Sequence, residues 1–549
     1  MIQLHVDAKG KLRIRCPSHM AGLVRSIPGV QWNSKDRDWR VANTRIVRKE
    51  VMTRLVPLGL QMAPEVEAIV SAPVAAKKEK PGGLPAGFLF RTQPYDHQRK
   101  ASSFVYNNRY SALFMEQGTG KTKSAIDALA AGGHRFILVV CPVIVRRTWK
   151  EQVAEHAPLG WDCLVLDDSG KRKFDQWVHF PSAVKVLVVG VESLSAGNAK
   201  VFAERFVNLG PSVMVVDEAH KIKTHSSART KECIRIGRNC EKRIIMTGTP
   251  TSNSLMDLYA QFEFLDPDII GCGDYWSFQS RYAVMGGYEQ REVVGYNNTD
   301  ELLDSIAPYV FKVTKEECLD LPPKLYKRVY TEMNPKQKVM YNDLKKTWSA
   351  AGGVFSVKSA VELSLRLHQV SGGFIKGDSD PVFLGTNTVS FPKVAALIEI
   401  CEQSSGPVVV WCAYRAEVDL VVRSLREAFP QNRVVEIHGG VSDGDRQKAR
   451  ESIQSGDARF LVGTASAGGV GITLTASNTM VYYSNSFNYV DRSQSEDRIH
   501  RIGQTLPCTI YDIINSGSTD ELVMAALGDK KDVSVWLSEN LDKAKEELK

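Results

Sequence analysis

Residues 115–122 read M-E-Q-G-T-G-K-T and combine residue types that suit the binding of phosphate groups. Glycines let backbone N–H groups close around phosphate oxygens, and a helix that starts after them points its positive end at the same oxygens. We expect Lys121 to reach the terminal phosphates of a nucleotide and the Thr122 hydroxyl to bind Mg²⁺. The strict phosphate-loop pattern has a further glycine where Met115 stands, so the match is partial. The predicted binding residues are Gly118, Thr119, Gly120, Lys121 and Thr122.

Two adjacent carboxylates, Asp217 and Glu218, follow the apolar run 213–216. At the end of a buried strand such a pair can divide the work of hydrolysis, because Asp217 can hold the Mg²⁺ shell while Glu218 polarises the attacking water. The alternative is the common enrichment of acids at the start of a helix. That alternative does not account for a buried strand that ends in D-E-A-H (217–220) downstream of a phosphate loop, so we favour the catalytic interpretation.

A third segment, residues 494–504, reads Q-S-E-D-R-I-H-R-I-G-Q. If it is helical, Gln494, Arg498 and Arg501 share one face. Two guanidinium groups on one face can neutralise the charge that develops on a transferred γ-phosphoryl group. Without a phosphate loop elsewhere in the chain, an exposed basic helix face would be the simpler interpretation. We therefore predict these three residues, together with Glu218, as the catalytic set.

Short apolar, β-branched runs separated by helical stretches must position these segments. Such strands, alternating with helices, are typical of parallel sheets covered on both faces. The runs fall into two groups, before about residue 250 and after about residue 405, so we predict an α/β fold of two parallel-sheet lobes with helical insertions. The expected strands are 136–140, 184–189, 213–216, 243–246, 408–411, 433–437, 459–462 and 480–483.

The first sixty residues hold the whole net charge of +8, with twelve Lys and Arg against four acids. Alternating apolar residues there predict a small ββαββα module, and its charge favours a polyanionic partner, the alternative being a solvated basic face. Trp32 and Trp39 could stack on nucleic-acid bases. They could equally pair across a hairpin and pack the module's own core, which we favour for Trp39. The predicted DNA contacts of the module are Arg13, Arg15, Arg37 and Arg40.

Composition along the chain predicts its division into domains. Residues 66–90 carry the Pro, Gly and Lys content of a linker. The predicted domains are the basic module 1–65, a first lobe 91–325, a second lobe 326–525 with a helical insertion 335–375, and a C-terminal helix 526–549.

Ten scattered cysteines without a C-x-x-C pair argue against a zinc ribbon or a secreted disulfide scaffold and fit a reducing compartment. The N-terminus does not have the pattern of a signal peptide. The longest apolar run, 136–145, is interrupted by Pro142 and is too short to span a bilayer. We therefore expect a soluble intracellular protein that does not act at a membrane.

Taken in order, several segments resemble the motifs of the Swi/Snf (sucrose-non-fermenting) group of superfamily-two helicase-type ATPases, over about residues 91–525. These segments are 94–98 (the adenine-reading Gln element), 116–122 (motif I), 141–142 (motif Ia), 217–220 (motif II), 247–250 with 265–267 (motif III), 321–324 (the entry into the second half), 463–475 (motif V) and 494–504 (motif VI).

The resemblance implies two RecA-like lobes that open and close as ATP is bound and hydrolysed with Mg²⁺, moving along one strand of a DNA duplex, usually without separating the strands. It implies that Gln98 contacts the adenine and that Gly471 belongs to the ATP site. It also implies that His220, Thr247 and Thr249 couple hydrolysis to movement.

A motor of this kind should contact DNA phosphates rather than base edges, so that binding depends on salt and little on sequence. Arg146 and Arg147 follow Cys141-Pro142, and Thr464 and Ser466 follow a predicted strand. We predict all four as phosphate contacts, although each could equally be an ordinary surface residue.

The sequence departs from the family pattern in a few places. Gln117 and Thr119 stand where Met and Leu are usual, a change that should spare ATP binding. Thr473 replaces Asn, and F-N-Y (487–489) replaces W-N-P, in the part that couples to DNA. In the basic module, residues 27–32 followed by Trp39 resemble the HepA-related (HARP) module of annealing helicases, which precedes the motor and recognises branched or partly single-stranded DNA.

These patterns predict an ATP- and Mg²⁺-dependent double-stranded-DNA translocase that acts on forked or branched DNA by fork regression, branch migration or strand annealing. The alternatives are a translocase that strips proteins such as RNA polymerase from DNA and an ATP-gated DNA-binding scaffold. We expect a monomer in the cytoplasm or nucleoid of a bacterial or phage-infected cell, or in the nucleus of a eukaryotic one. His438, Asp443 and Arg446 are assigned structural roles.

Overall fold

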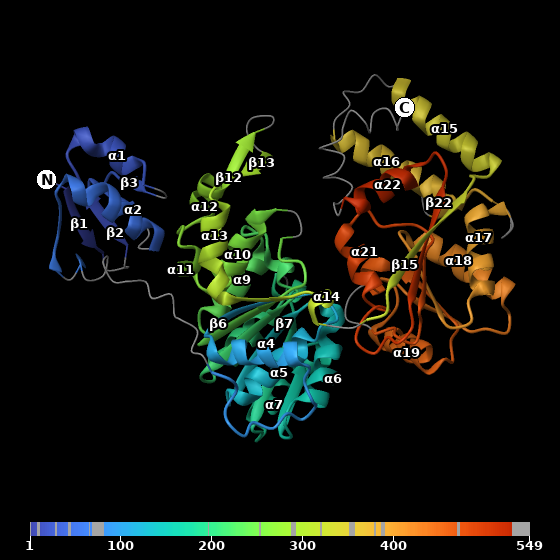
Figure 1. Ribbon diagram of the computed structural model, residues 1–549, viewed down its shortest axis with the longest axis horizontal. Coiled ribbons are helices and arrows are strands. Elements are labelled where there is room, and N and C mark those ends of the chain that lie inside the picture. Colours follow the sequence, from blue (N-terminus) through green and yellow to red (C-terminus); the bar gives the residue numbers. More distant parts are fainter. Residues whose placement is uncertain are drawn as a thin grey trace. The chain divides into compact units, whose positions relative to one another are not determined.

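The computed structural model describes most of the chain and divides it into two compact units (Figure 1). The first unit contains residues 1–116 and 120–314, and the second contains residues 117–119 and 315–549. The described residues are all of 1–549 except 1, 8–10, 28–29, 42–44, 65, 68–81, 196, 252–253, 287–291, 319–320, 351–356, 378–379, 386–389, 469–472 and 530–549. The predicted helix 526–549 thus falls largely outside them.

The N-terminal basic module is a five-stranded sheet in the order β3-β4-β2-β1-β5. Strands β1 to β4 pair antiparallel, and β5, which the sequence did not predict, adds in parallel to β1. Apolar residues of alternate strand positions pack with the two helices into one core, which leaves the polar positions on the other face of the sheet. The elements are β1 (Ile2–Val6), β2 (Leu12–Arg15), α1 (Ala21–Arg25), β3 (Gln31–Asn33), β4 (Asp38–Val41), α2 (Arg45–Leu55) and β5 (Leu60–Met62).

The main sheet of the first unit has seven strands in the order β14-β6-β11-β10-β7-β9-β8, all parallel. Its central strands are continuous runs of buried apolar residues, as expected for a sheet covered on both faces. The strands are β6 (Tyr110–Met115), β7 (Phe136–Cys141), β8 (Trp161–Val165), β9 (Val184–Gly190), β10 (Ser212–Asp217), β11 (Lys242–Met246) and β14 (Val310–Val313).

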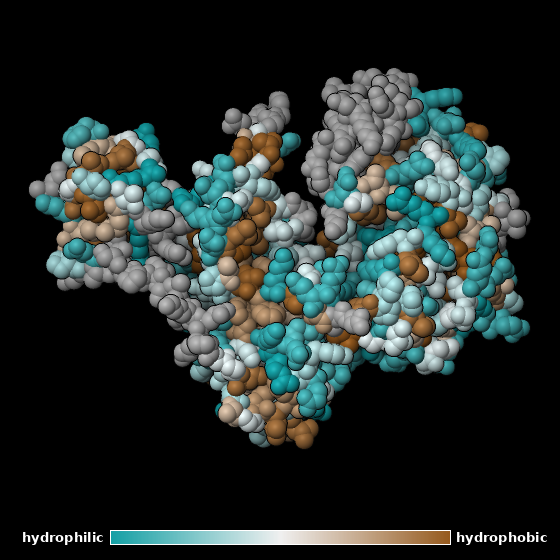
Figure 2. All heavy atoms as spheres, viewed as in Figure 1, coloured by the Kyte–Doolittle hydropathy of each residue, from teal (hydrophilic) through white to brown (hydrophobic). Residues whose placement is uncertain are grey.

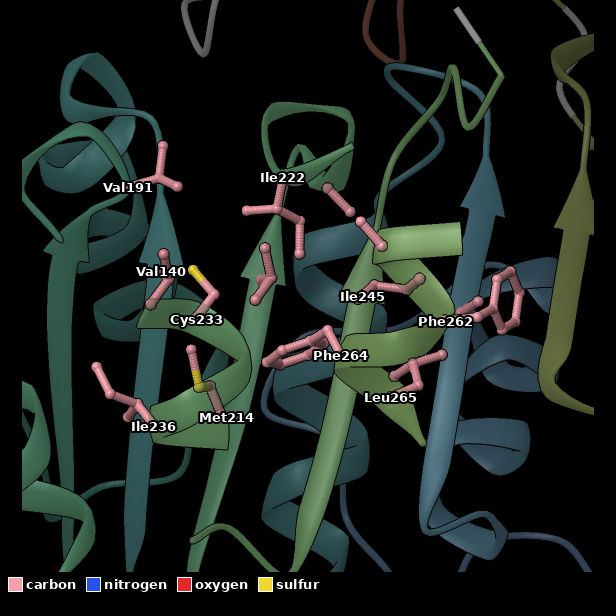
Figure 3. Close-up of a cluster of buried hydrophobic side chains, with 14 of the residues drawn as sticks. Val140, Val191, Met214, Ile222, Cys233, Ile236, Ile245, Phe262, Phe264 and Leu265 are labelled. Atoms are coloured by element: carbon pink, nitrogen blue, oxygen red, sulfur yellow. The ribbon is translucent and has the colours of Figure 1, made fainter. Parts of the chain in front are cut away.

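Helices cover both faces of this sheet. Figure 3 shows α9 (Ala228–Gly237) and α10 (Leu258–Leu265) in front of the strands, with Cys233 beside Val140 and Phe264 between Met214 and Ile245. Other helices lie behind the strands in the same view. The remaining elements of the unit are α4 (Asp96–Asn107), α5 (Lys121–Ala131), α6 (Arg146–His156), α7 (Asp168–His179), α8 (Ala199–Val207), α11 (Pro267–Ile270), α12 (Tyr275–Tyr282), β12 (Ala283–Gly286), β13 (Glu292–Tyr296) and α13 (Thr299–Ile306).

The second unit is built on a six-stranded parallel sheet in the order β15-β22-β21-β18-β20-β19. Buried side chains form separate clusters on its two faces, one including Val410 and the other Trp411, because neighbouring residues of a strand point to opposite faces. The strands are β15 (Lys324–Thr331), β18 (Val408–Cys412), β19 (Val434–Ile437), β20 (Phe460–Thr464), β21 (Thr479–Tyr482) and β22 (Cys508–Asn515).

The helices of the second unit include the predicted insertion, present as α15 and α16 with the small hairpin of β16 and β17. These helices pack with α22 in a cluster of their own. The elements are α14 (Lys315–Cys318), α15 (Pro335–Ala350), α16 (Val357–Ser371), β16 (Phe374–Lys376), β17 (Pro381–Phe383), α17 (Pro392–Gln403), α18 (Arg415–Ala428), α19 (Asp443–Ser455), α20 (Ala465–Gly468), α21 (Tyr489–Glu496) and α22 (Thr519–Gly528).

The predicted α/β fold with two parallel-sheet lobes is confirmed, and each of the eight predicted strands is present. The face of the second unit seen in Figure 2 is largely hydrophilic, with apolar residues in small patches. Within the described residues no helix combines the length and apolar character needed to cross a bilayer. All ten cysteines are free.

Candidate nucleotide site and nucleic-acid contacts

The predicted catalytic segments of the first unit meet at one edge of its sheet. Strands β6, β11 and β10 are consecutive neighbours, with Leu113 opposite Met246 and Met246 opposite Asp217. Because all three strands are parallel, their carboxyl ends lie side by side, about 5 Å apart from strand to strand. The phosphate loop, the Asp217-Glu218 pair and Thr247 follow these three ends, which is the usual location of a ligand site in such sheets.

The phosphate loop has the backbone that its glycines predict. Gly118 and Gly120 have φ angles of 80° and 90°, in the left-handed region that disfavours other residues. A Cβ atom on Gly120 would lie 2.2 Å from Nε2 of Gln98, so a side chain does not fit there. This close approach places Gln98, the predicted adenine contact, directly beside the loop. Gln98 is buried on α4, and its Oε1 accepts a hydrogen bond from the Tyr95 N–H at 3.1 Å.

Lys121 and Thr122 are the first two residues of α5, where a bound anion meets the positive end of the helix. The Lys121 ammonium donates to the carbonyl oxygens of Met115 and Glu116, at 2.9 and 3.2 Å. The Lys121 ammonium group therefore lies against the backbone of the phosphate loop. Thr119 is fully buried and Thr122 is half-buried.

Asp217 ends β10, and Glu218 follows it in a left-handed conformation with φ of 52°. Such backbone conformations are costly for non-glycine residues and concentrate at functional sites. Loss of contact with water, and then the nearby charge of Glu218, raise the pKa of Asp217 to about 6. The charge of Lys121 acts in the opposite direction, but within the described residues Asp217 forms no salt bridge, so this carboxylate is desolvated without a directly paired cation.

A chain of polar contacts leads from Glu218 to the end of β11. Nδ1 of His220 lies 3.3 Å from a carboxylate oxygen of Glu218 and 3.4 Å from the Thr247 hydroxyl. The same hydroxyl accepts the Thr249 backbone N–H at 3.1 Å. The three residues predicted to couple hydrolysis to movement thus lie in one connected series with the predicted general base.

The residues present fit a Mg²⁺ ion held together with a nucleotide. Asp217 supplies a desolvated carboxylate whose raised pKa a cation would lower, and Thr122 supplies a hydroxyl at the start of α5, directly after the phosphate loop. Among the described residues no cluster of three or more His, Cys, Asp or Glu side chains could hold a metal alone. Mg²⁺ commonly binds one or two protein ligands plus phosphate oxygens, so this sparse donor set suits it.

In the second unit, the predicted helix through Gln494, Arg498 and Arg501 is only partly present. Helix α21 ends at Glu496, so Gln494 is helical while Arg498 and Arg501 lie in the turns that follow. The premise that the three share one helix face is therefore wrong. Arg498 still returns to the helix end, because its Nε donates to the Gln494 carbonyl oxygen at 2.9 Å. Gly471 lies outside the described residues.

A buried ionic cluster fixes α21 to its sheet. Arg492 of α21 pairs with Asp512 of β22 and, at 2.8 Å, with Glu496, and its guanidinium stacks 3.7 Å from the ring centre of Tyr482. Lys324 donates to Glu496 at 2.8 Å. Although burial acts in the opposite direction, the charges of Arg492 and Lys324 lower the pKa of Glu496 to about 2. The cluster holds the segment that leads to Arg498 and Arg501.

The predicted DNA-contacting residues of the two lobes differ in whether their side chains already bond to other parts of the protein. Arg146 donates to the carbonyl oxygens of Val143 and Leu166, at 3.1 and 2.9 Å, while Arg147 beside it is exposed. In the second unit Ser466 is exposed on α20 and Thr464 is half-buried at the end of β20. The role of these four residues as DNA contacts stays a prediction.

The predicted DNA-contacting arginines of the basic module also divide into two kinds. Arg13 and Arg40 both bond to Asp38, which is fully buried beneath them. Arg15 and Arg37 are exposed. In the same module Trp39 belongs to the core, as favoured from the sequence, whereas Trp32 is 52% exposed with its ring centre 5.0 Å from that of Trp39.

Sequence reasoning missed several residues that organise the site. Trp149 bonds to Asp217 from 68 positions away, and Asp38 and Arg492 hold other charged residues in place. The tryptophan, on the helix after Cys141-Pro142, was the one detectable signal, because a large aromatic residue there must be buried or functional. The two charged residues carry no local pattern that distinguishes them from surface residues.

A parallel sheet whose strand ends carry a glycine loop, an Asp-Glu pair and a threonine relay defines the class of phosphate-loop α/β proteins. The chain belongs to the SNF2-related family. The model of the SNF2-related domain matches residues 43–372, and the helicase conserved C-terminal domain matches residues 392–503. The resemblance to the Swi/Snf group is thereby confirmed, while the HARP-like assignment of the basic module stays a prediction.

The chain is similar to several curated proteins. It is 23% identical to the SWI/SNF-related matrix-associated actin-dependent regulator of chromatin subfamily A-like protein 1 homolog of Caenorhabditis elegans, over 97% of this chain and 75% of that protein. It is 24% identical to the DNA annealing helicase and endonuclease ZRANB3 of Homo sapiens, over 76% of this chain and 38% of that protein. Other relatives are much longer, and the chain spans 27%, 36% and 40% of three of them.

Among solved structures, the chain is similar to the Sulfolobus solfataricus SWI2/SNF2 ATPase core in complex with dsDNA. The two are 21% identical, with a TM-score of 0.39, over 82% of this chain and 93% of that chain.

Proposed function

We propose that the protein is an ATP- and Mg²⁺-dependent translocase on double-stranded DNA that acts on forked or branched substrates. The observation that carries the proposal is the edge of the main sheet, where a glycine loop with Lys121 lies beside the Asp217-Glu218 pair and its link through His220 to Thr247. This arrangement provides groups that bind a triphosphate, hold a proton and transmit a change to a neighbouring strand.

Each of these residues has a step it can perform. Lys121, now on two loop carbonyl oxygens, can turn to the terminal phosphates when they enter the loop. Glu218 can accept a proton from the attacking water. A Mg²⁺ ion held by Asp217 and Thr122 would supply charge neutralisation on the phosphates. Arg498 and Arg501 of the second unit are proposed to stabilise the γ-phosphoryl group, so turnover would require the two lobes to close.

Loss of the γ-phosphate would be sensed by Glu218 and passed on through the imidazole of His220 to Thr247 and Thr249. Alternating lobe closure and opening would then move the protein along the duplex backbone. Arg147, Arg146, Thr464 and Ser466 are the proposed phosphate contacts, and contacts of this kind carry little sequence information.

The preference for forked or branched DNA rests on the basic module and on the relatives. The module presents exposed Arg15 and Arg37 and a half-exposed Trp32, which suit phosphates and an unpaired base. ZRANB3, to which this chain is similar, is named a DNA annealing helicase and endonuclease. We expect the working species to be a monomer associated with DNA in a bacterial or phage-infected cell, or in a nucleus.

The test measures ATP hydrolysis with no DNA, single-stranded DNA, blunt duplex and forked duplex, at two salt concentrations, together with displacement of a triplex-forming strand from a duplex. We expect stimulation by duplex, further stimulation by a fork, and triplex displacement only while ATP is hydrolysed. Glu218→Gln should lower turnover by about 10²- to 10⁴-fold and stop displacement while DNA binding persists.

Other outcomes would point elsewhere. A Glu218→Gln variant that keeps its biological output would favour the ATP-gated scaffold. Triplex displacement without any fork preference, combined with release of a stalled RNA polymerase, would favour the protein-stripping alternative. Stimulation by RNA alone would contradict a DNA substrate.

A further inference from the structure

Trp149 joins the helix after β7 to the acid at the end of β10. It lies on α6, its side chain is 2% exposed, and its indole Nε1–H donates to Oδ2 of Asp217 at 2.8 Å. Strands β7 and β10 are direct neighbours, with Val140 opposite Val216, so the helix that follows one strand reaches the end of the other.

The hydrogen bond from Trp149 helps to fix the orientation of the Asp217 carboxylate. Its other oxygen, Oδ1, accepts the backbone N–H of Glu218 at 3.0 Å. With one donor on each oxygen, from two different segments, the carboxylate plane is fixed rather than free to rotate. A movement of Trp149 would therefore turn the carboxylate that is proposed to hold Mg²⁺.

The same helix carries charge on its outer side. Arg147 and Lys150, on either side of Trp149 in the sequence, are both exposed. The first residue of α6, Arg146, is held by the carbonyl oxygens of Val143 and Leu166. Helix α6 is therefore anchored at its first residue, Arg146, and bonded to Asp217 one turn later through Trp149. Binding of a DNA phosphate backbone to Arg147 and Lys150 would act on this helix.

We propose that Trp149 is a positioning residue that links contact with duplex DNA at Arg147 and Lys150 to the orientation of the Asp217 carboxylate. This rests on the proposed function and adds a route by which DNA would accelerate ATP hydrolysis. In this proposal Trp149 acts through its hydrogen bond to Asp217 and not by contact with ATP or DNA.

The experiment compares Trp149→Phe with Trp177→Phe in the full-length protein. Trp177 makes a matched control, because it is 9% exposed in the same unit and its Nε1 has no hydrogen-bond partner among the described residues. For each variant we would measure basal and duplex-stimulated ATP hydrolysis, duplex binding by anisotropy, and the Mg²⁺ concentration that half-saturates binding of a fluorescent ADP analogue without turnover.

For Trp149→Phe we expect the ratio of stimulated to basal hydrolysis to fall by at least 5-fold and the half-saturating Mg²⁺ concentration to rise several-fold, with duplex binding unchanged. Trp177→Phe should change none of these. A stimulation ratio equal to that of Trp177→Phe, or an equal fall in basal and stimulated rates, would overturn the inference. A wild-type protein that duplex does not stimulate would instead contradict the proposed function itself.

A second measurement keeps the test independent of how well Trp149→Phe folds. In wild-type protein with fluorinated tryptophan, the nine tryptophans give separate resonances. The Trp149 signal is the one missing from Trp149→Phe or from Trp149→His. It should shift when duplex is added without nucleotide, and a signal that does not move would overturn the inference.

Discussion

Two groups of desolvated carboxylates, one in each unit, are balanced in opposite ways. At the end of β10, Asp217 and Glu218 lie close together, and Asp217 has a pKa raised to about 6 and no salt bridge among the described residues. Under α21, Glu496 and Asp512 are saturated by Arg492 and Lys324, and the pKa of Glu496 is lowered to about 2. The first group is built to receive a cation, and the second to hold a segment in place.

The difference separates a functional from a structural use of buried charge. Keeping like charges together without a counter-ion costs stability, and a protein retains that cost where a ligand relieves it. A cluster that is fully paired gains little net stability, but removing one partner leaves an uncompensated charge. The two regions should therefore respond in opposite directions to the same kind of substitution.

The largest expected contrast is between Asp217→Asn and Asp512→Asn, which remove one charge from each group at nearly constant volume. Asp217→Asn should lower ATP hydrolysis by at least about 100-fold, because the proposed Mg²⁺ ligand is lost, while thermal stability stays level or rises. Asp512→Asn should destabilise the second unit by up to about 3–5 kcal/mol, since Arg492 keeps Glu496 but loses its other carboxylate partner. Steady-state kinetics and urea unfolding of both variants would check this. A stability loss in Asp217→Asn as large as that in Asp512→Asn would contradict the comparison.

A glycine pair gives the next contrast, between the phosphate loop and an open site. Gly120→Ala places a Cβ 2.2 Å from Gln98 Nε2 at a φ of 90°, so nucleotide affinity should fall by about 10- to 100-fold. A Cβ atom on Gly439 would meet no other atom within 4 Å, and the φ of this glycine is not left-handed, so Gly439→Ala is the control and should bind normally. Titration with a fluorescent ATP analogue measures both. Equal affinities would show that the loop tolerates the strain.

The sequence predicted most of the strands that read as continuous apolar runs. It missed the edge strands Trp161–Val165, Val310–Val313 and Lys324–Thr331 and also the interior strands Tyr110–Met115 and Cys508–Asn515, whereas the edge strand Val434–Ile437 was predicted. A central strand such as Val184–Gly190 reads as a continuous apolar run, while Trp161–Val165 and Lys324–Thr331 are edge strands that carry Asp162 or Lys and Arg residues toward solvent. Local patterns cannot distinguish such an edge strand from a loop.

The candidate site also contains some residues that local sequence patterns predict and others that they do not. The phosphate loop and the Asp217-Glu218 pair are local patterns, and their positions were predicted from the sequence. The helix expected through Arg501 ends at Glu496, where the pairing of Arg492 with distant Asp512 fixes α21. Contacts between residues far apart in sequence, such as Trp149 with Asp217, become visible only once the fold is known.

A third contrast concerns pH and lies within the second unit. Burial raises the pKa of Glu417, the residue near the start of α18, to about 7, against an ordinary value of 4.5. The folded state therefore prefers the protonated acid, and the stability that this provides is complete below pH 4.5 and is lost as the pH rises through 7. By linkage the change is of order 3 kcal/mol at most. Glu496 is ionised across this window and should contribute no such slope.

Hydrogen exchange of the α18 amides at pH 5 and pH 7.5, corrected for the intrinsic pH dependence of exchange, measures this effect locally. Glu417→Gln, which is neutral at every pH, should abolish the difference, while its contacts with the Ala413 and Tyr414 N–H groups can be kept by the amide oxygen. Protection that increases from pH 5 to pH 7.5 in the wild-type protein would contradict the assigned direction.

The smallest effect, on DNA affinity, is expected in the basic module, which carries both exposed arginines and arginines that are paired with Asp38. Arg15 and Arg37 are exposed, so replacing both with Ala should weaken binding to a forked duplex several-fold and reduce the slope of log K against log salt by about 2. Arg13 and Arg40 neutralise Asp38, and replacing both should reduce that slope less while destabilising the module, because a fully buried carboxylate loses its partners. Anisotropy at several salt concentrations, with thermal unfolding of each double variant, separates the two effects. Equal slopes and equal stabilities in the two double variants would mean that pairing with Asp38 leaves the charge of Arg13 and Arg40 as available to DNA as that of the exposed pair.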